Sequence, residues 1–220
     1  MYKSICSLIA IGCLIIGCGN PESQQGLITK DVAKELDERE IRVISEAEIV
    51  ERAFEYGRKV ADSAQASLIQ ELMQAIEAGG ITNAIDYCNV NALPLLQSMS
   101  DEYGVEVRRA SNRWRNPQDQ PNEAEMPLLE AYEYNMENGL ELTDNVQKIG
   151  TDYILYTKPI VIGSGLCLNC HGIENTQVQA ETLEALQEKY PNDNALNHEM
   201  GDLRGMWSIK IARRKLVLLK

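Results

Sequence analysis

The segment Cys167-Leu168-Asn169-Cys170-His171 constrains this chain of 220 residues more than any other feature. Two thiols three positions apart on a helical turn point to one side, where they can add to the two vinyl groups of a haem. The histidine that follows then lies over the porphyrin ring and offers an imidazole nitrogen to the iron. The motif therefore predicts one covalent c-type haem, attached through Cys167 and Cys170, with His171 as an axial ligand.

Three other uses of the motif compete with haem attachment. A thioredoxin-like C-x-x-C follows a strand in a βαβ pattern, and the sequence shows no such pattern. A zinc site needs four tetrahedral ligands, which Cys88 or His198 would have to complete. A structural disulfide between Cys167 and Cys170 would leave Cys88 alone. The histidine directly after the second cysteine, together with the export signal described next, favours haem over all three.

The first residues have the pattern of an export signal. Lys3 precedes an apolar run over 5–16, which has the length of a signal h-region and is short for a membrane span. The run ends in Gly17-Cys18, which resembles a bacterial lipobox, so we expect cleavage before Cys18 and acylation of its thiol. An ordinary secretory signal or a short membrane anchor with an incidental cysteine is the alternative. We expect residence in the bacterial cell envelope, lipid-anchored on the periplasmic side, and Gly19 slightly favours the outer membrane.

The six cysteines sort by these expectations. Cys6 and Cys13 leave with the signal and Cys18 takes lipid, so Cys88 remains beside the two cysteines of the motif. Three is an odd number for an oxidising compartment, so at least one cysteine should do chemistry other than disulfide formation. Cys88, His198, Met200 and Met206 are the available candidates for the sixth iron ligand.

The charge balance bears on partners and function. The net charge of −12 repels phosphate backbones, so nucleic acid is not an expected partner. The short basic stretch Arg213-Arg214-Lys215 does not overturn that expectation. No acid–base pair and no open metal position is visible in the sequence, so we expect a protein that is not an enzyme.

The chain divides into a signal peptide over 1–17, a lipidated Cys18 with a polar tether to residue 44, and one domain over 45–220. Ser45 caps a long helix that Gly79-Gly80 stops. A second helix runs from about Asn83, and Pro94 should bend or break it. The sequence also predicts three strands, near 105–108, 153–162 (with Pro159 at an edge or bend) and 206–211. Two further helices are expected, one after Asn122 with Met126 facing inward, and one over 181–189. We expect an α+β fold with an antiparallel sheet.

Several stretches together resemble the single-c-haem, PAS-like domain family, whose structural prototype is cyanobacterial. The matching segments span roughly 46–212: Ala84-Ile85-Asp86-Tyr87-Cys88, Val107-Arg108-Arg109-Ala110-Ser111, Arg115-Asn116-Pro117, Pro121 to Glu125, Tyr156-Thr157-Lys158-Pro159-Ile160, Cys167 to Gly172, and Gly201-Asp202-Leu203-Arg204-Gly205. The resemblance implies a PAS-like antiparallel sheet flanked by helices, with haem held against the sheet.

The resemblance also implies that Cys88 is the second axial ligand, which would stabilise Fe(III) and lower the reduction potential. It further makes four arginines candidates to meet the haem propionates: Arg108, Arg109, Arg115 and Arg204. Surface salt bridging is an equally good use of any one of them.

Two departures from the family pattern bear on function. The stretch 194–200 differs from the usual family sequence, which keeps His198 as the second choice after Cys88 for the sixth ligand. Many relatives are fused to a histidine kinase or cyclase, whereas this chain stops soon after the Trp207 strand. We therefore expect a redox or gas sensor that signals to a separate partner protein such as a sensor kinase, or a low-potential electron-transfer cytochrome with a redox partner.

Overall fold

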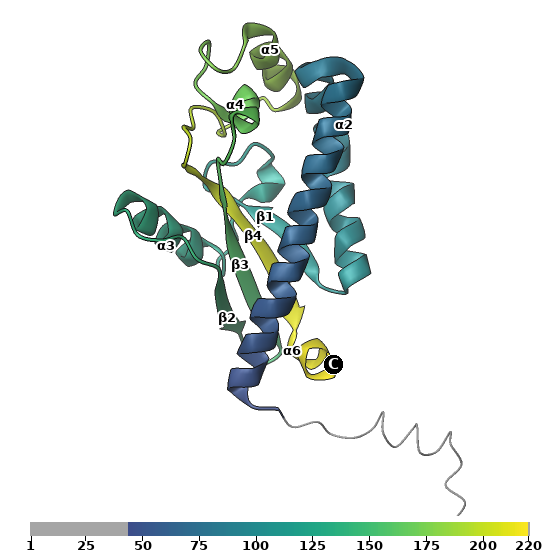
Figure 1. The fold of residues 1–220 in the computed structure, drawn as a ribbon, viewed down its shortest axis with the longest axis vertical. Coiled ribbons are helices and arrows are strands. Elements are labelled where there is room, and N and C mark those ends of the chain that lie inside the picture. Colours follow the sequence, from purple (N-terminus) through teal and green to yellow (C-terminus); the bar gives the residue numbers. More distant parts are fainter. Residues whose placement is uncertain (1–43, 220) are drawn as a thin grey trace, which may run out of the picture. The chain divides into compact units, whose positions relative to one another are not determined.

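The computed structural model describes residues 44–219. The expected signal peptide, Cys18 and the tether as far as residue 43 lie outside the described residues. Within 44–219 the elements follow the order α2, β1, η2, α3, β2, β3, α4, α5, β4 and α6 (Figure 1). None of the described helices is long and apolar enough to cross a membrane.

Helix α2 (Glu46–Tyr103) forms two arms that lie side by side (Figure 1). The expected N-cap is confirmed, because Ser45 Oγ accepts a hydrogen bond from the Glu48 N–H at 3.1 Å. Helical geometry is interrupted at Gly79 and Gly80, and Gly80 has φ +81°, a conformation that favours glycine. We call residues 46–78 the first arm and residues 81–103 the second arm.

Pro94 was expected to bend or break the second helix, and the structure shows that it does not break the second arm. The helix continues through Pro94 to Tyr103, and its only non-helical dihedrals are at Gly79 and Gly80. The ring of Pro94 conflicts with the carbonyl of Val90, and Val90 is 67% exposed. Water can therefore satisfy the groups that the proline leaves unpaired.

The sheet has four antiparallel strands in the order β1-β4-β3-β2. Their bounds are Glu106–Ala110 for β1, Asn145–Ile149 for β2, Tyr153–Val161 for β3 and Leu203–Ala212 for β4. Pro159 lies where β3 extends beyond the end of β2, whose pairing stops at Thr157, so its missing N–H breaks no ladder bond there. Pro159 is therefore at an edge on the β2 side of β3, while on the other side it still pairs with Met206 of β4.

Strand β4 is more deeply buried than its alternating pattern indicates. In the sequence Trp207, Ile209 and Ile211 alternate with Ser208 and Lys210, which predicts a half-buried strand with Ser208 on its polar face. Ser208 is instead 2% exposed, and its hydroxyl donates to Glu125 at 2.6 Å. Because β4 pairs with β1 and β3, and helices cover both faces, its polar positions need buried partners.

The remaining helices cover the sheet and build one end of the domain. They are η2 (Pro117–Asp119), α3 (Met126–Glu137), α4 (Gly165–His171), α5 (Ala180–Lys189) and α6 (Arg213–Leu218). Asn122 and Glu125 cap the start of α3 reciprocally, as expected. Met126 does not face inward, because it is 38% exposed, whereas Leu129 is fully buried.

The core consists of three hydrophobic clusters. The largest packs the first arm of α2 against β3 and β4, and includes Tyr156 and Trp207. A second lies under α3. The third joins the start of the second arm to α5 through Ile85 and Leu186. The predicted fold, a PAS-like antiparallel sheet flanked by helices with a long N-terminal helix, is confirmed.

Candidate cofactor site

A cavity of about 300 Å³ lies between the two arms of α2, one face of the sheet and α4. It is large enough for an organic ligand of ordinary size. Its apolar wall comes from the two arms, which contribute Leu68, Ile69, Leu72, Ile76, Ile81, Ala84 and Ile85. The opposite wall comes from the sheet and carries Arg109, Arg204 and Trp207. Cys88, Cys167, Cys170 and His171 line the same cavity, so the fold brings together segments about 80 residues apart.

Helix α4 presents the motif as its spacing requires. It covers Gly165–His171, so both cysteines and the histidine lie within two turns. Cys167 and Cys170 are half-buried and unpaired. The helix stops at Gly172, where a Cβ atom would lie 2.6 Å from the Leu168 carbonyl oxygen, so only glycine fits this close approach.

His171 is held in one tautomer. Its Nδ1 lies 2.9 Å from the carbonyl oxygen of Ala195, and a carbonyl can only accept, so Nδ1 carries the proton. Nε2 therefore keeps its lone pair. Burial, and then the positive charges of Arg204 and Arg115, hold the pKa of His171 well below its ordinary value. The imidazole is thus neutral and able to bind a metal ion.

Cys88 lies on the second arm, on the face shared with Ala84 and Ile85, and lines the cavity. Burial raises the pKa of its thiol, while the charges of Arg109 and Arg115 oppose that rise. A half-buried thiol between two cationic groups can bind a metal as thiolate. The position agrees with the ligand role that the resemblance implies.

Three of the four candidate arginines line the cavity: Arg109, Arg115 and Arg204. Arg109 pairs with Asp119 at 3.2 Å and Arg115 with Asp193 at 2.9 Å, so part of their charge is already compensated. No acidic side chain forms an ion pair with Arg204 among the residues 44–219.

Of the three arginines, Arg204 is the one whose positive charge is most disfavoured by its surroundings. Burial, followed by the neighbouring charges of Arg115 and Arg109, lowers the pKa of its guanidinium to about 9. The Nε atoms of Arg204 and Arg109 are buried without a hydrogen-bond partner. Unsatisfied buried donors are costly, so this wall is suited to an anionic group such as a carboxylate.

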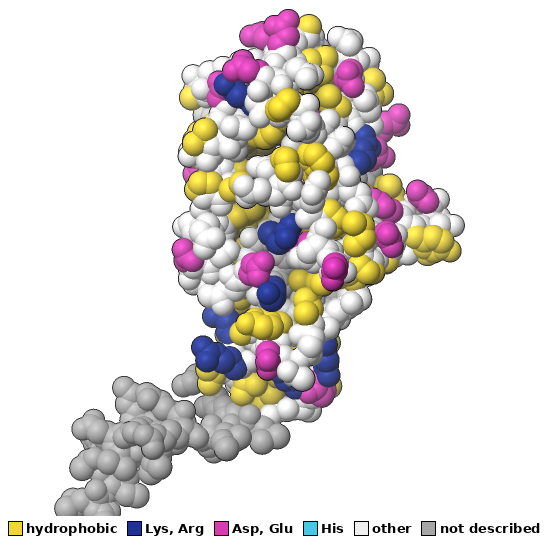
Figure 2. All heavy atoms as spheres, turned by 180° about the vertical axis from the view of Figure 1, so that it is seen from behind, with side chains coloured by type: hydrophobic (Ala, Val, Ile, Leu, Met, Phe, Trp, Pro, Cys, Tyr) yellow, Lys and Arg dark blue, Asp and Glu magenta, His cyan; other side chains and the backbone are white. Residues whose placement is uncertain are grey.

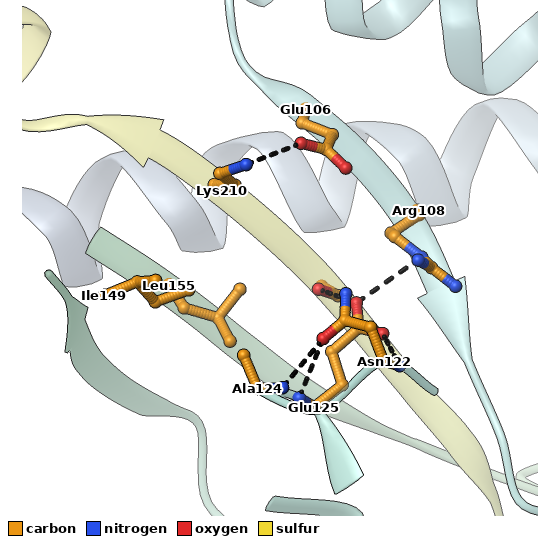
Figure 3. A pocket seen from close by; sticks show the side chains of 9 residues that line it. Glu106, Arg108, Asn122, Ala124, Glu125, Ile149, Leu155 and Lys210 are labelled. Atoms are coloured by element: carbon orange, nitrogen blue, oxygen red, sulfur yellow. Dashed lines mark hydrogen bonds and ion pairs between the residues drawn. The ribbon is translucent and has the colours of Figure 1, made fainter. Parts of the chain in front are cut away.

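Arg108 does not reach the cavity. Successive residues of a strand face opposite sides, so Arg108 lies on the far face of the sheet from Arg109. There its Nε lies 3.4 Å from the buried Glu125 carboxylate (Figure 3). Its guanidinium also donates to the Gln120 carbonyl at 2.7 Å. The structure therefore separates Arg108 from the other candidate site residues.

His198 is the second choice for the sixth ligand from the sequence. It lies between the hydrophilic neighbours Asn197 and Glu199, yet it is 1% exposed, and it does not line the cavity. Its main-chain N–H donates to the His171 carbonyl at 2.9 Å, which keeps the two histidines adjacent. The structure does not bring His198 across the cavity from His171, where a sixth ligand would stand.

Sequence reasoning missed Arg113 and the two buried aspartates. Arg113 contacts His198 Nδ1 at 3.2 Å and also the Leu196 carbonyl. Asp119 and Asp193 fix the side chains of Arg109 and Arg115. Arg113 falls between two of the matched segments, and an acidic residue far along the chain gives no local signal of its partner.

The residues of the cavity fit the predicted haem. Two thiols from one helix turn, a neutral imidazole, a third thiol on the second arm and unsatisfied guanidinium donors are the groups needed to attach it, ligate it and meet its carboxylates. The thioredoxin-like and zinc-binding interpretations of the cysteine motif have less support. The strands of the described sheet pair only antiparallel, and residues 44–219 contain no group of three or more His, Cys, Asp or Glu placed to hold a metal ion.

Comparison with known proteins supports this picture. A family model described as Tll0287-like matches residues 30–212. This chain belongs to the Tll0287-like family. Among solved structures it is similar to the crystal structure of the cyanobacterial heme-protein Tll0287, with 26% identity and a TM-score of 0.52. The match covers 72% of this chain and 94% of that one. No curated protein matches the chain.

Membership of the Tll0287-like family agrees with the resemblance drawn from the motifs. The family model covers the described domain almost completely, including the cysteine motif, the arm that carries Cys88 and the strand that carries Arg204. The four-stranded sheet and long N-terminal helix of this chain are consistent with a Tll0287-like fold.

Proposed function

We propose that this chain is a c-type haem protein that carries one haem, covalently attached through Cys167 and Cys170. One observation carries the proposal: the motif, Cys88 and the unsatisfied donors of two arginines line a single cavity. The relation to a solved haem protein supports haem binding independently. When bound, the haem supplies one-electron redox chemistry at its iron.

Different residues of the chain would ligate the iron, pair with the propionates and exclude water. His171 offers Nε2 to the iron because the Ala195 carbonyl holds the proton on Nδ1. Cys88 offers its sulfur from the second arm. Arg109, Arg115 and Arg204 provide positive charge for the propionates, and the apolar wall of α2 excludes water from the ring.

We further propose that the protein is not an enzyme but a redox or gas sensor outside the cytoplasm, tethered to a membrane through Cys18. Attachment of c-type haem normally takes place outside the cytoplasm, which agrees with the signal pattern of residues 1–18. Cys88 lies on the second arm of α2, which Gly79-Gly80 joins to the first, whereas the attachment thiols lie on α4, so a bound haem would stay attached if the Cys88 thiol left the iron. Such release would be the signal passed to a partner protein.

A low-potential electron-transfer cytochrome is the second candidate, and the rim of the cavity favours it. Ile69 and Val161 line the cavity and are 44% and 39% exposed. An apolar, accessible rim at a cofactor pocket suits brief contact with a redox partner.

Removing the attachment thiols tests the central claim. Cys167→Ala combined with Cys170→Ala should abolish covalent haem, measured by haem staining on a denaturing gel. Cys88→Ala is the matched control: it should keep the stain but lose the low-spin thiolate signature in electron paramagnetic resonance of the oxidised protein. Retained stain in the double variant would refute covalent attachment through the motif, and an unchanged spectrum in Cys88→Ala would refute ligation by Cys88.

Carbon monoxide distinguishes the two candidate roles. In a sensor, carbon monoxide added to the reduced protein should quickly displace the Cys88 sulfur from the iron, and this displacement should change the visible absorption spectrum. In an electron carrier the ligand should be displaced slowly or not at all, because electron transfer is fastest when the coordination does not change. A reduced spectrum that carbon monoxide leaves unaltered would remove the main support for the sensor.

A further inference from the structure

The loop after α5 encloses the side of His171 that does not face the cavity. Three contacts from this loop reach the end of α4. The Ala195 carbonyl accepts from His171 Nδ1, the Asn197 N–H donates to the Gly172 carbonyl at 2.9 Å, and the His198 N–H donates to the His171 carbonyl at 2.9 Å. Asn197 has φ +60°, a conformation that asparagine tolerates better than most residues and that turns the chain back toward α4.

This loop places the His198 ring against the His171 ring. The two ring centres are 6.3 Å apart and the ring planes are nearly perpendicular, at 82°. His198 is 1% exposed, so no solvent separates or loosens the pair. A perpendicular ring at this distance obstructs rotation of the His171 imidazole about its own side-chain axis.

Arg113 orients His198 for this contact. A guanidinium can only donate, so the 3.2 Å contact makes His198 Nδ1 the acceptor and leaves the proton on Nε2. Asp202 also faces Nδ1, at 3.8 Å, but its carboxylate accepts from the Glu199 N–H at 2.7 Å. The other terminal guanidinium nitrogen of Arg113 donates to the Leu196 carbonyl, so both terminal nitrogens of the group are held by hydrogen bonds.

The position of His198 is costly for the fold. Its Nε2 is buried without a hydrogen-bond partner, and a buried unsatisfied donor costs on the order of 1–3 kcal/mol. An aliphatic or phenyl side chain would avoid that cost. The perpendicular contact with His171 needs only an aromatic ring, whereas the link to Arg113 needs the ring nitrogen of a histidine.

We propose that His198 is a positioning residue that fixes the plane of the His171 imidazole, and that Arg113 anchors it for this task. The inference rests on the proposed function, because the plane matters only if His171 ligates iron. The orientation of an axial imidazole plane relative to the porphyrin nitrogens sets the splitting of the iron orbitals, and hence the g values of the oxidised low-spin protein. One fixed plane gives one set of g values.

Electron paramagnetic resonance of the oxidised holoprotein tests the proposal. The wild type should give one low-spin species. His198→Ala should give at least two species or broadened g values, because the imidazole can then take more than one orientation, and His198→Phe should restore a single species by replacing the ring. Met200→Ala is the matched control: Met200 is in the same loop, but it is 54% exposed and does not line the cavity, so it is not placed to ligate the iron and its loss should leave the spectrum unchanged.

Each outcome decides one claim. If His198→Ala keeps a single, unshifted set of g values, or if His198→Phe behaves like His198→Ala, the positioning role is overturned. If His198→Ala does not fold, as judged by thermal unfolding, His198→Phe and the wild type still decide, since two low-spin species in either would overturn the proposal. Absence of covalent haem stain from the wild type would instead overturn the proposed function and leave the folded loop intact.

Discussion

Neighbouring residues on one strand have unlike surroundings at this site. Arg109 faces the cavity and pairs with Asp119, whereas Arg108 faces the opposite side of the sheet and pairs with Glu125. Both carboxylates are buried, so each arginine compensates a charge that would be costly alone. Substitution of either arginine therefore uncompensates a buried carboxylate, but only substitution of Arg109 also changes the charge of the cavity.

A matched pair of substitutions uses this difference. Arg109→Gln should lower the reduction potential by on the order of tens of millivolts, because removing a positive charge near the iron favours its oxidised form. Arg108→Gln should leave the potential unchanged, although both variants should lose roughly 1–3 kcal/mol of unfolding free energy through an uncompensated carboxylate. Protein-film voltammetry and urea unfolding measure the two effects. Equal shifts in potential for both variants would contradict the assignment of Arg109 to the cofactor cavity.

At the scale of elements, α2 sets the geometry of the cavity. Its first arm packs on the sheet, and its second arm returns beside it and carries Cys88 (Figure 1). The arms are held together by Asn83, which donates to the Ala75 carbonyl at 2.7 Å, and by a hydrogen bond from Tyr87 to Glu71. The turn at Gly79-Gly80 therefore decides where Cys88 lies.

Two glycines of α2 should respond differently to alanine. At Gly57 a Cβ atom would overlap the ring of the buried Tyr156, so Gly57→Ala should cost about 1–3 kcal/mol or more despite the better helix propensity of alanine. At Gly80 the space is open but φ is +81°, so Gly80→Ala should cost only about 1 kcal/mol of backbone strain. Urea unfolding of both variants gives the comparison. A larger loss at Gly80 would mean that the turn, rather than packing on Tyr156, limits the stability of α2.

At the scale of the whole molecule, the surface charge bears on the choice of partner. On the face seen in Figure 2, Lys and Arg side chains occur in small separate groups among acidic and apolar ones. Several cations of the described residues are paired, as Arg213 is with Glu46 and Arg58 with Asp144. Such pairing lowers the positive charge that these side chains could offer to a phosphate backbone.

The proposed membrane attachment also concerns the whole molecule. Cys18→Ala should abolish incorporation of labelled palmitate and move the protein from the membrane pellet to the soluble fraction, because no acyl chain would then be attached. Cys13→Ala, which alters a cysteine expected to leave with the signal, should keep both the label and the membrane association. Palmitate incorporation that survives Cys18→Ala would refute the lipobox.

The sequence predicted the local features well. The Ser45 cap, the stop at Gly79-Gly80 and the helix over α5 follow from local preferences, and the structure confirms them. The errors involve tertiary surroundings. The burial of Ser208 depends on a strand lying on each side of β4, the exposure of Met126 depends on how α3 is turned, and Pro94 stays helical because Val90 faces solvent.

The same division holds for the site. By itself the sequence determined the attachment motif and His171, because the spacing of these groups is a property of one helical turn. Only the tertiary structure decided which distant groups join them. Cys88 enters the cavity because α2 folds back on itself, Arg108 is separated from Arg109 by the pleat of β1, and His198 stands beside His171 because a loop turns at Asn197. Contacts between residues far apart in the chain depend on how the elements pack, and that packing has no local signature.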